Sequence, residues 1–219
     1  IQSKLGTVLD VTSASAAAGT NVQTYTFNQS TAQKWTLLET EKTLYSIMGK
    51  TNVSVSQMVK FYKNKATVSY PYSNVSEAPT IEKFCQIYKE ESEVEGVKAE
   101  VAFAQAMMET GFLKFGGDVK KDQYNFAGIG AIGGGSSGAK FDSIRIGIRA
   151  HVQHLKAYAS KEALKQPVVD PRFQYVKRGS AEYVQWLGQK ENPNGYGWAT
   201  AKNYGNNIVK LYILPMKKY

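Results

Sequence analysis

The feature that most constrains the fold of this chain is a mostly apolar segment, residues 97–110, whose last turn carries a carboxylic acid. Its Val, Ala, Phe and Met residues lie nearly all round a helical wheel, which predicts a helix in the middle of a domain. Gly111 follows directly and predicts the end of this helix. The sequence therefore predicts a buried central helix with Glu109 near its C-terminus.

Glu109 is the residue of this helix that is suited to chemistry. The negative end of the helix dipole and the apolar neighbours both disfavour an ionised carboxylate, so we expect a raised pKa. A carboxylic acid that stays protonated near neutral pH can donate a proton to a leaving oxygen, as glycosidic bond cleavage requires. Gln105 lies one turn earlier on the same face and is predicted to orient the acid. The alternative is a solvated charge at a helix end.

Hydrophobic periodicity predicts further helices around this central one. They cover residues 54–63, 80–95, 143–159, 181–187 and 200–214, with the last helix ending before Pro215. Residues 115–142 are rich in Gly and predict an irregular or β-containing lobe over a cleft. The whole pattern favours an α+β fold that is mainly α-helical.

Composition divides the chain into three parts. Residues 1–38 are rich in Ser, Thr, Ala, Asn and Gln and alternate with period two, which predicts a short all-β segment. Residues 39–79 predict a linker with one helix, for which Ser54 is a suitable cap. Residues 80–219 then form the predicted catalytic domain.

The charge of the chain limits its partners. The formal net charge of +9 favours polyanions. Nucleic acid is the usual polyanion, but the lysines are scattered and no nucleic-acid-binding motif is present, so we predict no nucleic-acid partner. An anionic cell wall, with its phosphate and carboxylate polymers, is an equally good physical partner. No apolar run reaches the length of a membrane span. The chain begins with Ile and shows no signal peptide at its start, as expected for a fragment or a mature form.

Three patterns that could indicate other chemistry are rejected. Residues 128–133 match a dinucleotide-binding fingerprint, but the glycines and serines that follow cannot sustain the helix that it requires. His151 and His154 lack a third ligand, so we expect no metal and no cofactor. Cys85 is the single cysteine and lies on an apolar helix face, which predicts a buried thiol and no internal disulfide.

Several short motifs, in order along the chain, resemble one family. Residues 101–112 contain the pattern Gln-x-x-x-Glu-Thr-Gly, and residues 125–129 read Asn-Phe-Ala-Gly-Ile. With further segments between residues 141 and 205, these motifs are similar to the bacterial endo-β-N-acetylglucosaminidases of glycoside hydrolase family 73. The resemblance covers residues 80–212 and implies a lysozyme-like fold.

This resemblance implies a secreted, wall-associated bacterial autolysin that cleaves the β-1,4 bond between N-acetylglucosamine and N-acetylmuramic acid in peptidoglycan. It assigns the catalytic acid to Glu109. Aromatic rings can stack on sugar faces, which makes Tyr124, Tyr196 and Trp198 candidate contacts. The residues predicted to bind substrate are Gln105, Tyr124, Asn125, Phe126, Gly128, Tyr196 and Trp198.

Most glycosidases use a second carboxylate, which the stretch from residue 128 to 141 does not supply. Asp142 is the nearest candidate, although a helix N-cap beside Ser143 is its other predicted role. Asp118 is interpreted as a surface charge. We therefore favour help from the acetamido group of the substrate, a known exception to the two-carboxylate scheme. Tyr204 matches a cleft tyrosine of the family and is the other candidate catalytic residue, with core packing as its alternative role.

Residues 1–38 resemble one repeat of a ricin-type β-trefoil lectin. A Gln-x-Trp motif at residues 33–35 and the segments 9–11 and 19–25 carry this resemblance. It implies sugar contacts at Asp10, Gln23 and Tyr25. A trefoil buries its core with three such repeats, so we expect further repeats upstream of this chain.

Two other functions remain open. A lytic transglycosylase shares the lysozyme-like fold and a lone Glu, but it leaves an anhydro-muramic end. A non-catalytic cell-wall carbohydrate-binding module would use the cleft and the lectin repeat for adhesion only.

Overall fold

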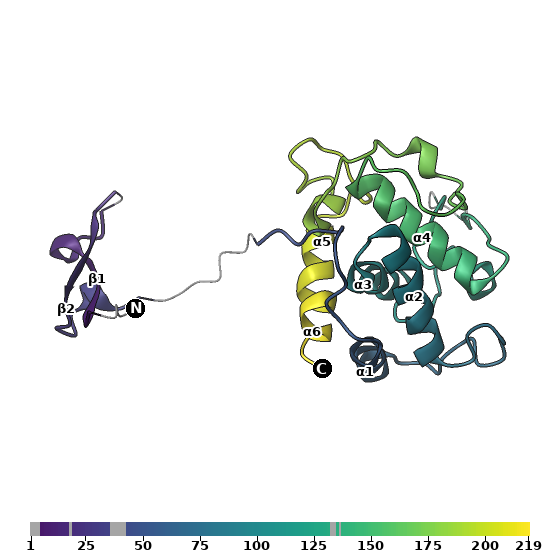
Figure 1. Cartoon of the computed structure of the whole chain (residues 1–219), viewed down its shortest axis with the longest axis horizontal. Coiled ribbons are helices and arrows are strands. Elements are labelled where there is room, and N and C mark those ends of the chain that lie inside the picture. The colour runs from purple at the N-terminus through teal and green to yellow at the C-terminus, as the bar shows by residue number, and fades with distance from the viewer. Residues whose placement is uncertain (1–4, 18, 36–42, 132–134, 136) are drawn as a thin grey trace. The chain divides into compact units, whose positions relative to one another are not determined.

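The computed structural model describes residues 5–17, 19–35, 43–131, 135 and 137–219 (Figure 1). The chain divides into two compact units, Ile1–Thr43 and Leu44–Tyr219. The first unit contains a two-stranded sheet, and the second contains the long helices.

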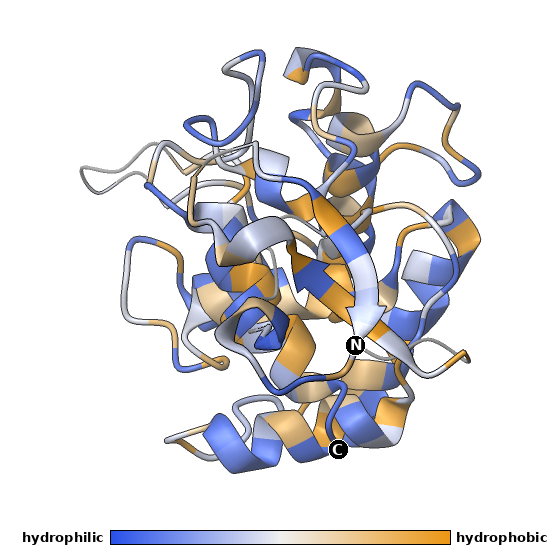
Figure 2. Cartoon of the chain, turned by 90° about the vertical axis from the view of Figure 1, so that its left-hand side faces the viewer, coloured by the Kyte–Doolittle hydropathy of each residue, from blue (hydrophilic) through white to orange (hydrophobic). Residues whose placement is uncertain are grey.

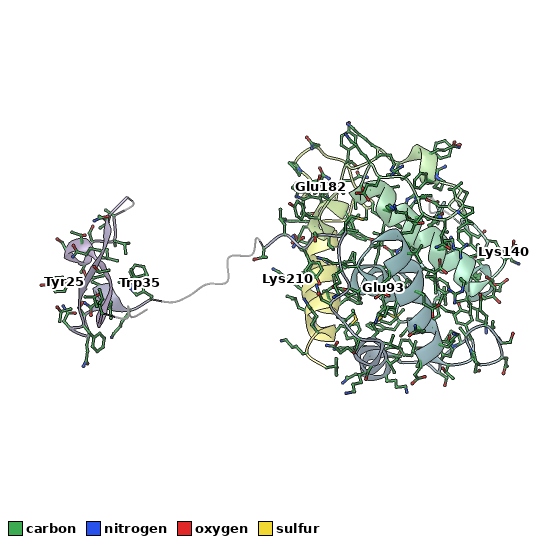
Figure 3. The ribbon with its side chains drawn as sticks, viewed as in Figure 1. Tyr25, Trp35, Glu93, Lys140, Glu182 and Lys210 are labelled. Carbon is green, nitrogen blue, oxygen red and sulfur yellow. The ribbon has the colours of Figure 1, made fainter. Side chains whose placement is uncertain are left out.

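The first unit is a hairpin, as its alternating sequence predicts. Strand β1 (Thr7–Val11) pairs with strand β2 (Val22–Thr26) in an antiparallel register that joins Thr7 to Thr26 and Val11 to Val22. The Gln-x-Trp motif folds back onto β1, because the indole nitrogen of Trp35 donates to the Leu9 carbonyl at 2.9 Å. Tyr25 and Trp35 both belong to this unit, as Figure 3 shows.

Asp10 is the polar centre of this hairpin. Its two carboxylate oxygens accept hydrogen bonds from the side-chain amides of Gln23, at 3.3 Å, and Gln33, at 3.0 Å. Tyr25 is exposed and Asp10 is buried. The Asp and Gln side chains for which the sequence predicted sugar contacts are therefore hydrogen-bonded to each other.

The second unit is built on four long helices whose ends follow local sequence signals. They are α1 (Val55–Lys65), α2 (Ile81–Glu95), α3 (Ala99–Thr110) and α4 (Ile144–Ala159). The side chains of Ser54, Thr80 and Ser143 cap the N-termini of α1, α2 and α4. Figure 2 shows that the helical ribbons carry both hydrophobic and hydrophilic residues, as amphipathic helices that cover a core do.

Helix α3 is the central element, as its sequence predicts. It contacts α1, α2, α4 and the C-terminal helix, and Figure 1 shows it between α2 and that helix (yellow). All its residues from Ala99 to Met107 are buried. The helix begins at Ala99 and not at Val97, because Val97 forms an isolated β-bridge with Met48.

The boundary between the two units falls after Thr43, within the segment 39–79 for which the sequence predicts a linker with one helix. Helix α1 packs against α2 within the second unit, and Met58 and Phe61 on its inner face are completely buried. Ile47 is also completely buried. Because these apolar side chains need cover, residues 44–79 belong to the helical unit. Residues 36–42 lie outside the described residues.

The C-terminal helix continues beyond its predicted end. It consists of α5 (Tyr204–Asn207), a π-helical stretch η6 (Ile208–Ile213) and α6 (Leu214–Met216). Pro215 therefore lies inside a helix. It lies in the first turn of α6, directly after the π-helical stretch, and its fixed φ of about −65° suits the helical backbone that continues through Ile213 and Leu214.

The lobe predicted over residues 115–142 is irregular. Its described residues hold one 3-10 turn, Lys121–Gln123, and no strand. Two backbone bonds close it, from Ala139 to the Ile129 carbonyl at 2.8 Å and from Phe141 to the Gln123 carbonyl at 2.9 Å. Residues 132–134 and 136, which include part of the rejected dinucleotide pattern, lie outside the described residues.

Within the described ranges, every helix is too short or too polar to cross a lipid bilayer. The same residues contain no group of three metal-ligating side chains.

Cys85 is completely buried, and burial raises the pKa of its thiol, so it is the core residue that the sequence predicts.

Candidate active site

Glu109 lies where helix α3 ends beside a cavity of about 290 Å³. The chain leaves the helix through three consecutive left-handed residues, with φ of 58° at Gly111, 58° at Phe112 and 63° at Leu113. Phe112 and Leu113 hold this conformation at an energetic cost, and Thr110 supports the turn by accepting a bond from the Leu113 amide at 2.9 Å. This sharp turn leaves the Glu109 side chain at the cavity.

The Glu109 carboxyl is exposed at the cavity, which corrects the expectation that its apolar neighbours bury it. Protein atoms on the other sides still displace much of the surrounding water, and this desolvation raises the pKa of Glu109. The hydrogen bond from Tyr204 lowers the pKa and is the weaker effect. The raised pKa that the sequence predicts is therefore found in an accessible acid, which can reach a ligand.

Tyr204 connects the first turn of α5 to the end of α3. Its hydroxyl donates a hydrogen bond to Glu109 Oε1 and accepts one from Gln105 Nε2 at 2.7 Å. Gln105, for which a sugar contact was predicted, is completely buried in this structure. Its side-chain amide holds the Tyr204 hydroxyl, which in turn holds the Glu109 carboxyl, so the predicted orienting role would act through Tyr204.

The hydrogen-bond chain continues inward through His151, a residue for which the sequence indicated no role in the site. His151 Nε2 lies 2.9 Å from Gln105 Oε1, and His151 Nδ1 lies 3.1 Å from the Tyr88 hydroxyl. Because an amide oxygen only accepts, Nε2 carries the proton and Nδ1 accepts from Tyr88. Burial lowers the pKa of His151 to about 3, which keeps the ring neutral. Every bond of the chain therefore has a defined direction.

Asn125 shapes the other side of the cavity. Its side-chain amide donates to the carbonyls of Ile129 at 2.9 Å and Ala139 at 3.0 Å, and its oxygen accepts from the Ile129 amide at 2.9 Å. The residue is buried but lines the cavity together with Gly128. These bonds hold the lobe closed beside the cavity.

Other predicted contacts lie elsewhere. Phe126 is buried in the core with its ring 5.1 Å from that of Phe84, because a large apolar side chain gains most from full burial. Tyr124 packs on Tyr72, with 5.8 Å between ring centroids. The ring of Tyr196 carries the Lys177 ammonium 3.8 Å from its centroid. None of these three predicted contacts is among the residues that line the Glu109 cavity.

The positions of Asp142 and Asp118 relative to Glu109 differ from those that the sequence predicts. Asp142 is exposed and does not line the Glu109 cavity, whereas the neighbouring Ser143 caps α4. Asp118, interpreted from the sequence as a surface charge, is exposed but lines the same cavity as Glu109. No sequence signal marks Asp118, since only the fold of the irregular lobe brings it to the cavity.

A second cavity of about 230 Å³ adjoins the first. Gly128 and Ala131 line both cavities, which makes this backbone segment their common wall. Trp198, a predicted stacking residue, lines the second cavity and is half-buried. The site thus extends from Glu109 past Gly128 to Trp198.

Comparison with known families agrees with this arrangement. Residues 85–213 match the glucosaminidase family, described as mannosyl-glycoprotein endo-beta-N-acetylglucosaminidase. The match covers more than half of the chain, and the chain belongs to this family of glycoside hydrolases. Residues 1–68 match the ricin-type beta-trefoil lectin domain-like family, as the N-terminal motifs indicate.

Two individual proteins illustrate this similarity. A protein of Borreliella burgdorferi, described as "Uncharacterized protein", is 46% identical over 132 residues, which are 60% of this chain and 61% of that protein. The chain thus matches less than two thirds of that relative's length. The crystal structure of S. aureus autolysin E in complex with muropeptide NAM-L-Ala-D-iGlu aligns to this chain with a TM-score of 0.51 and 19% sequence identity. The alignment covers 99% of this chain and 86% of the autolysin chain. That likeness confirms the predicted lysozyme-like fold.

Proposed function

We propose that this chain hydrolyses peptidoglycan at the β-1,4 bond between N-acetylglucosamine and N-acetylmuramic acid. The observation that carries the proposal is the Glu109 carboxyl, an acid of raised pKa at a cavity and held by Tyr204. Membership of the glucosaminidase family supports a glycosidase. The muropeptide bound to the autolysin of similar fold motivates the choice of substrate class.

In the proposed reaction, Glu109 is the general acid. Its proton passes to the glycosidic oxygen as the bond to the anomeric carbon of N-acetylglucosamine breaks. The acetamido oxygen of the same sugar attacks that carbon and forms a cyclic intermediate. Water then opens this intermediate and returns a proton to the Glu109 carboxylate. Tyr204 holds the carboxyl in one orientation through both steps.

Asp118 offers the alternative to the acetamido group, because it is the other carboxylate that lines the Glu109 cavity. An Asp118→Asn variant separates the two schemes. Substrate assistance predicts that the variant keeps its rate within about threefold. A catalytic base or nucleophile at this position predicts a loss of about 10²-fold or more.

The products of cleavage distinguish the proposal from its rivals. Mass spectrometry of digested, purified cell wall should show new reducing N-acetylglucosamine ends. Anhydro-muramic ends would identify a lytic transglycosylase. Binding of wall without release of fragments would identify an adhesion module. Only the first of these three results agrees with the proposal.

The same proposal places the protein outside the cell, at the wall. The net charge of +9 supports attraction to the phosphate and carboxylate groups of wall polymers. Such attraction is screened by salt, so wall retention should fall as the ionic strength rises. Co-sedimentation with purified walls at increasing sodium chloride measures this effect.

A further inference from the structure

The second cavity carries an unused positive charge. Arg172 lines it, and within the described part of the chain its guanidinium forms no ion pair and no hydrogen bond. The guanidinium carbon lies 4.6 Å from the ring centroid of Tyr175, another lining residue. Such stacking leaves the edge of the planar guanidinium available, with its donors arranged for a planar anion.

The backbone of Arg172 is held by Asp170, which is itself paired with His154. Its backbone amide donates to Asp170 Oδ1 at 2.8 Å, while Asp170 Oδ2 lies 2.6 Å from His154 Nδ1. Asp170 is buried and has both oxygens engaged in these bonds. The carboxylate closest in sequence to Arg172 is therefore directed at His154 and at backbone.

An aromatic wall stands beside this charge. The ring of His154 meets that of Trp198 edge-on at 4.6 Å between centroids, and Tyr158 packs on Trp198 at 5.8 Å. Burial raises the pKa of Tyr158, and the positive charge of Arg172 opposes that rise. The negative charge of Asp170 adds to that rise, so Asp170 and Arg172 both act on this wall residue, in opposite directions. A cavity with aromatic walls and a free guanidinium suits a ligand with an apolar face and an anionic end.

We propose that this second cavity is a subsite for a carboxylate on the peptide that the sugar strand carries, with Arg172 as its recognition residue. The inference rests on the proposed function, because that function supplies a glycan with peptide substituents. Gly128 and Ala131 line both cavities, so a glycan bound at Glu109 can place a substituent beyond this segment. Among the described residues that line the second cavity none is Asp or Glu, and both oxygens of the neighbouring Asp170 are engaged by His154 and by the Arg172 backbone amide.

Calorimetry tests this subsite without turnover. The protein is the full chain with Glu109→Gln, which binds but does not cleave in the proposed scheme. The two probes are N-acetylglucosaminyl-N-acetylmuramyl-L-alanyl-D-glutamate and the same molecule with its carboxylates converted to carboxamides. We expect the acid to bind about tenfold more tightly than the amide, as for one charge-assisted contact.

Two further variants identify the residue. Adding Arg172→Gln should remove the preference for the acid and leave the affinity for the amide unchanged. Adding Lys190→Gln removes one charge from an exposed position outside this cavity lining and should keep the preference. An undiminished preference in the Arg172→Gln protein, or equal binding of both probes to the parent, would overturn the subsite.

The experiments distinguish failure of the subsite from failure of the proposed function. If wild-type protein cleaves no wall but Arg172 still determines acid binding, the hydrolase proposal fails and the subsite stands. If wild-type protein cleaves wall and Arg172→Gln binds both probes as its parent does, the subsite fails and the hydrolase stands.

Discussion

The hydroxyl of Tyr204 donates a hydrogen bond to the carboxylate of Glu109, although the two residues are 95 positions apart in the sequence. This bond joins the end of the central helix to the start of the C-terminal helix. It opposes the desolvation that raises the pKa of Glu109. It also makes the orientation of the acid depend on the buried chain through Gln105 to His151.

Replacing Tyr204 with Phe should therefore alter the pH dependence of cleavage. Without the donor, desolvation acts alone and the pKa of Glu109 rises further. Because a general acid works in its protonated form, the alkaline limb of the pH–rate profile should move to higher pH. The rate at the optimum should fall by about tenfold as the carboxyl loses its orientation. Rates of wall lysis across pH measure both effects.

Tyr62→Phe is the matched control for this change. The Tyr62 hydroxyl is buried and makes no hydrogen bond within the described residues. Its removal should leave the pH–rate profile in place. If the alkaline limb of the Tyr204→Phe profile does not shift, the role assigned to the Tyr204 hydroxyl is contradicted.

His151 should make the protein sensitive to acid. Its pKa falls from 6.5 to about 3 on burial, so the unfolded chain binds one more proton between these values. Its contribution to the free energy of unfolding is therefore full at neutral pH and is lost as pH falls through this window. His151→Gln should flatten the dependence of stability on pH there by up to about 1.4 kcal/mol per pH unit. Urea unfolding at pH 4 to 7 measures the free energy of unfolding of both proteins. If its slope against pH is the same in His151→Gln and wild type, the prediction is refuted.

Gly147 is predicted to tolerate no side chain. A Cβ at this position would lie 1.9 Å from the Tyr124 carbonyl oxygen, a backbone atom that cannot easily move away. Gly147→Ala should lower the free energy of unfolding by about 1–3 kcal/mol, as overpacking does. Gly117→Ala is the control, since its Cβ meets no heavy atom within 4 Å. Equal melting temperatures for the two variants would show that the contact is relieved.

Local signals made much of this fold predictable. Ser54 begins α1 through a capping box with Gln57, and Gly96 ends α2 in the left-handed conformation. Each of these features depends on residues within a few positions of each other. The central position of α3 followed equally from its composition, because a helix that is apolar on all sides must be covered.

The site was less predictable because its contacts are long-range. The motif pointed to Glu109, but its accessibility depends on the strained turn after α3. Tyr204 had a packing role as its alternative, and the hydrogen bond became visible only when two distant helices were placed together. Asp118 carries no local pattern. Arg172 lies in a segment, residues 169–173, that resembles the family, but this resemblance implied no role for its side chain. Phe126 was assigned to the sugar although its burial serves the core.

The central claim is that Glu109 supplies the proton for glycan cleavage, and Glu109→Gln tests it most directly. Glutamine keeps an oxygen that can accept the Tyr204 bond, so the variant should retain its melting temperature. The measurement is the rate at which purified wall gains reducing N-acetylglucosamine ends, followed by mass spectrometry. We predict a fall of at least about 10²-fold against wild type. A folded variant that releases the same ends at the wild-type rate would contradict the account.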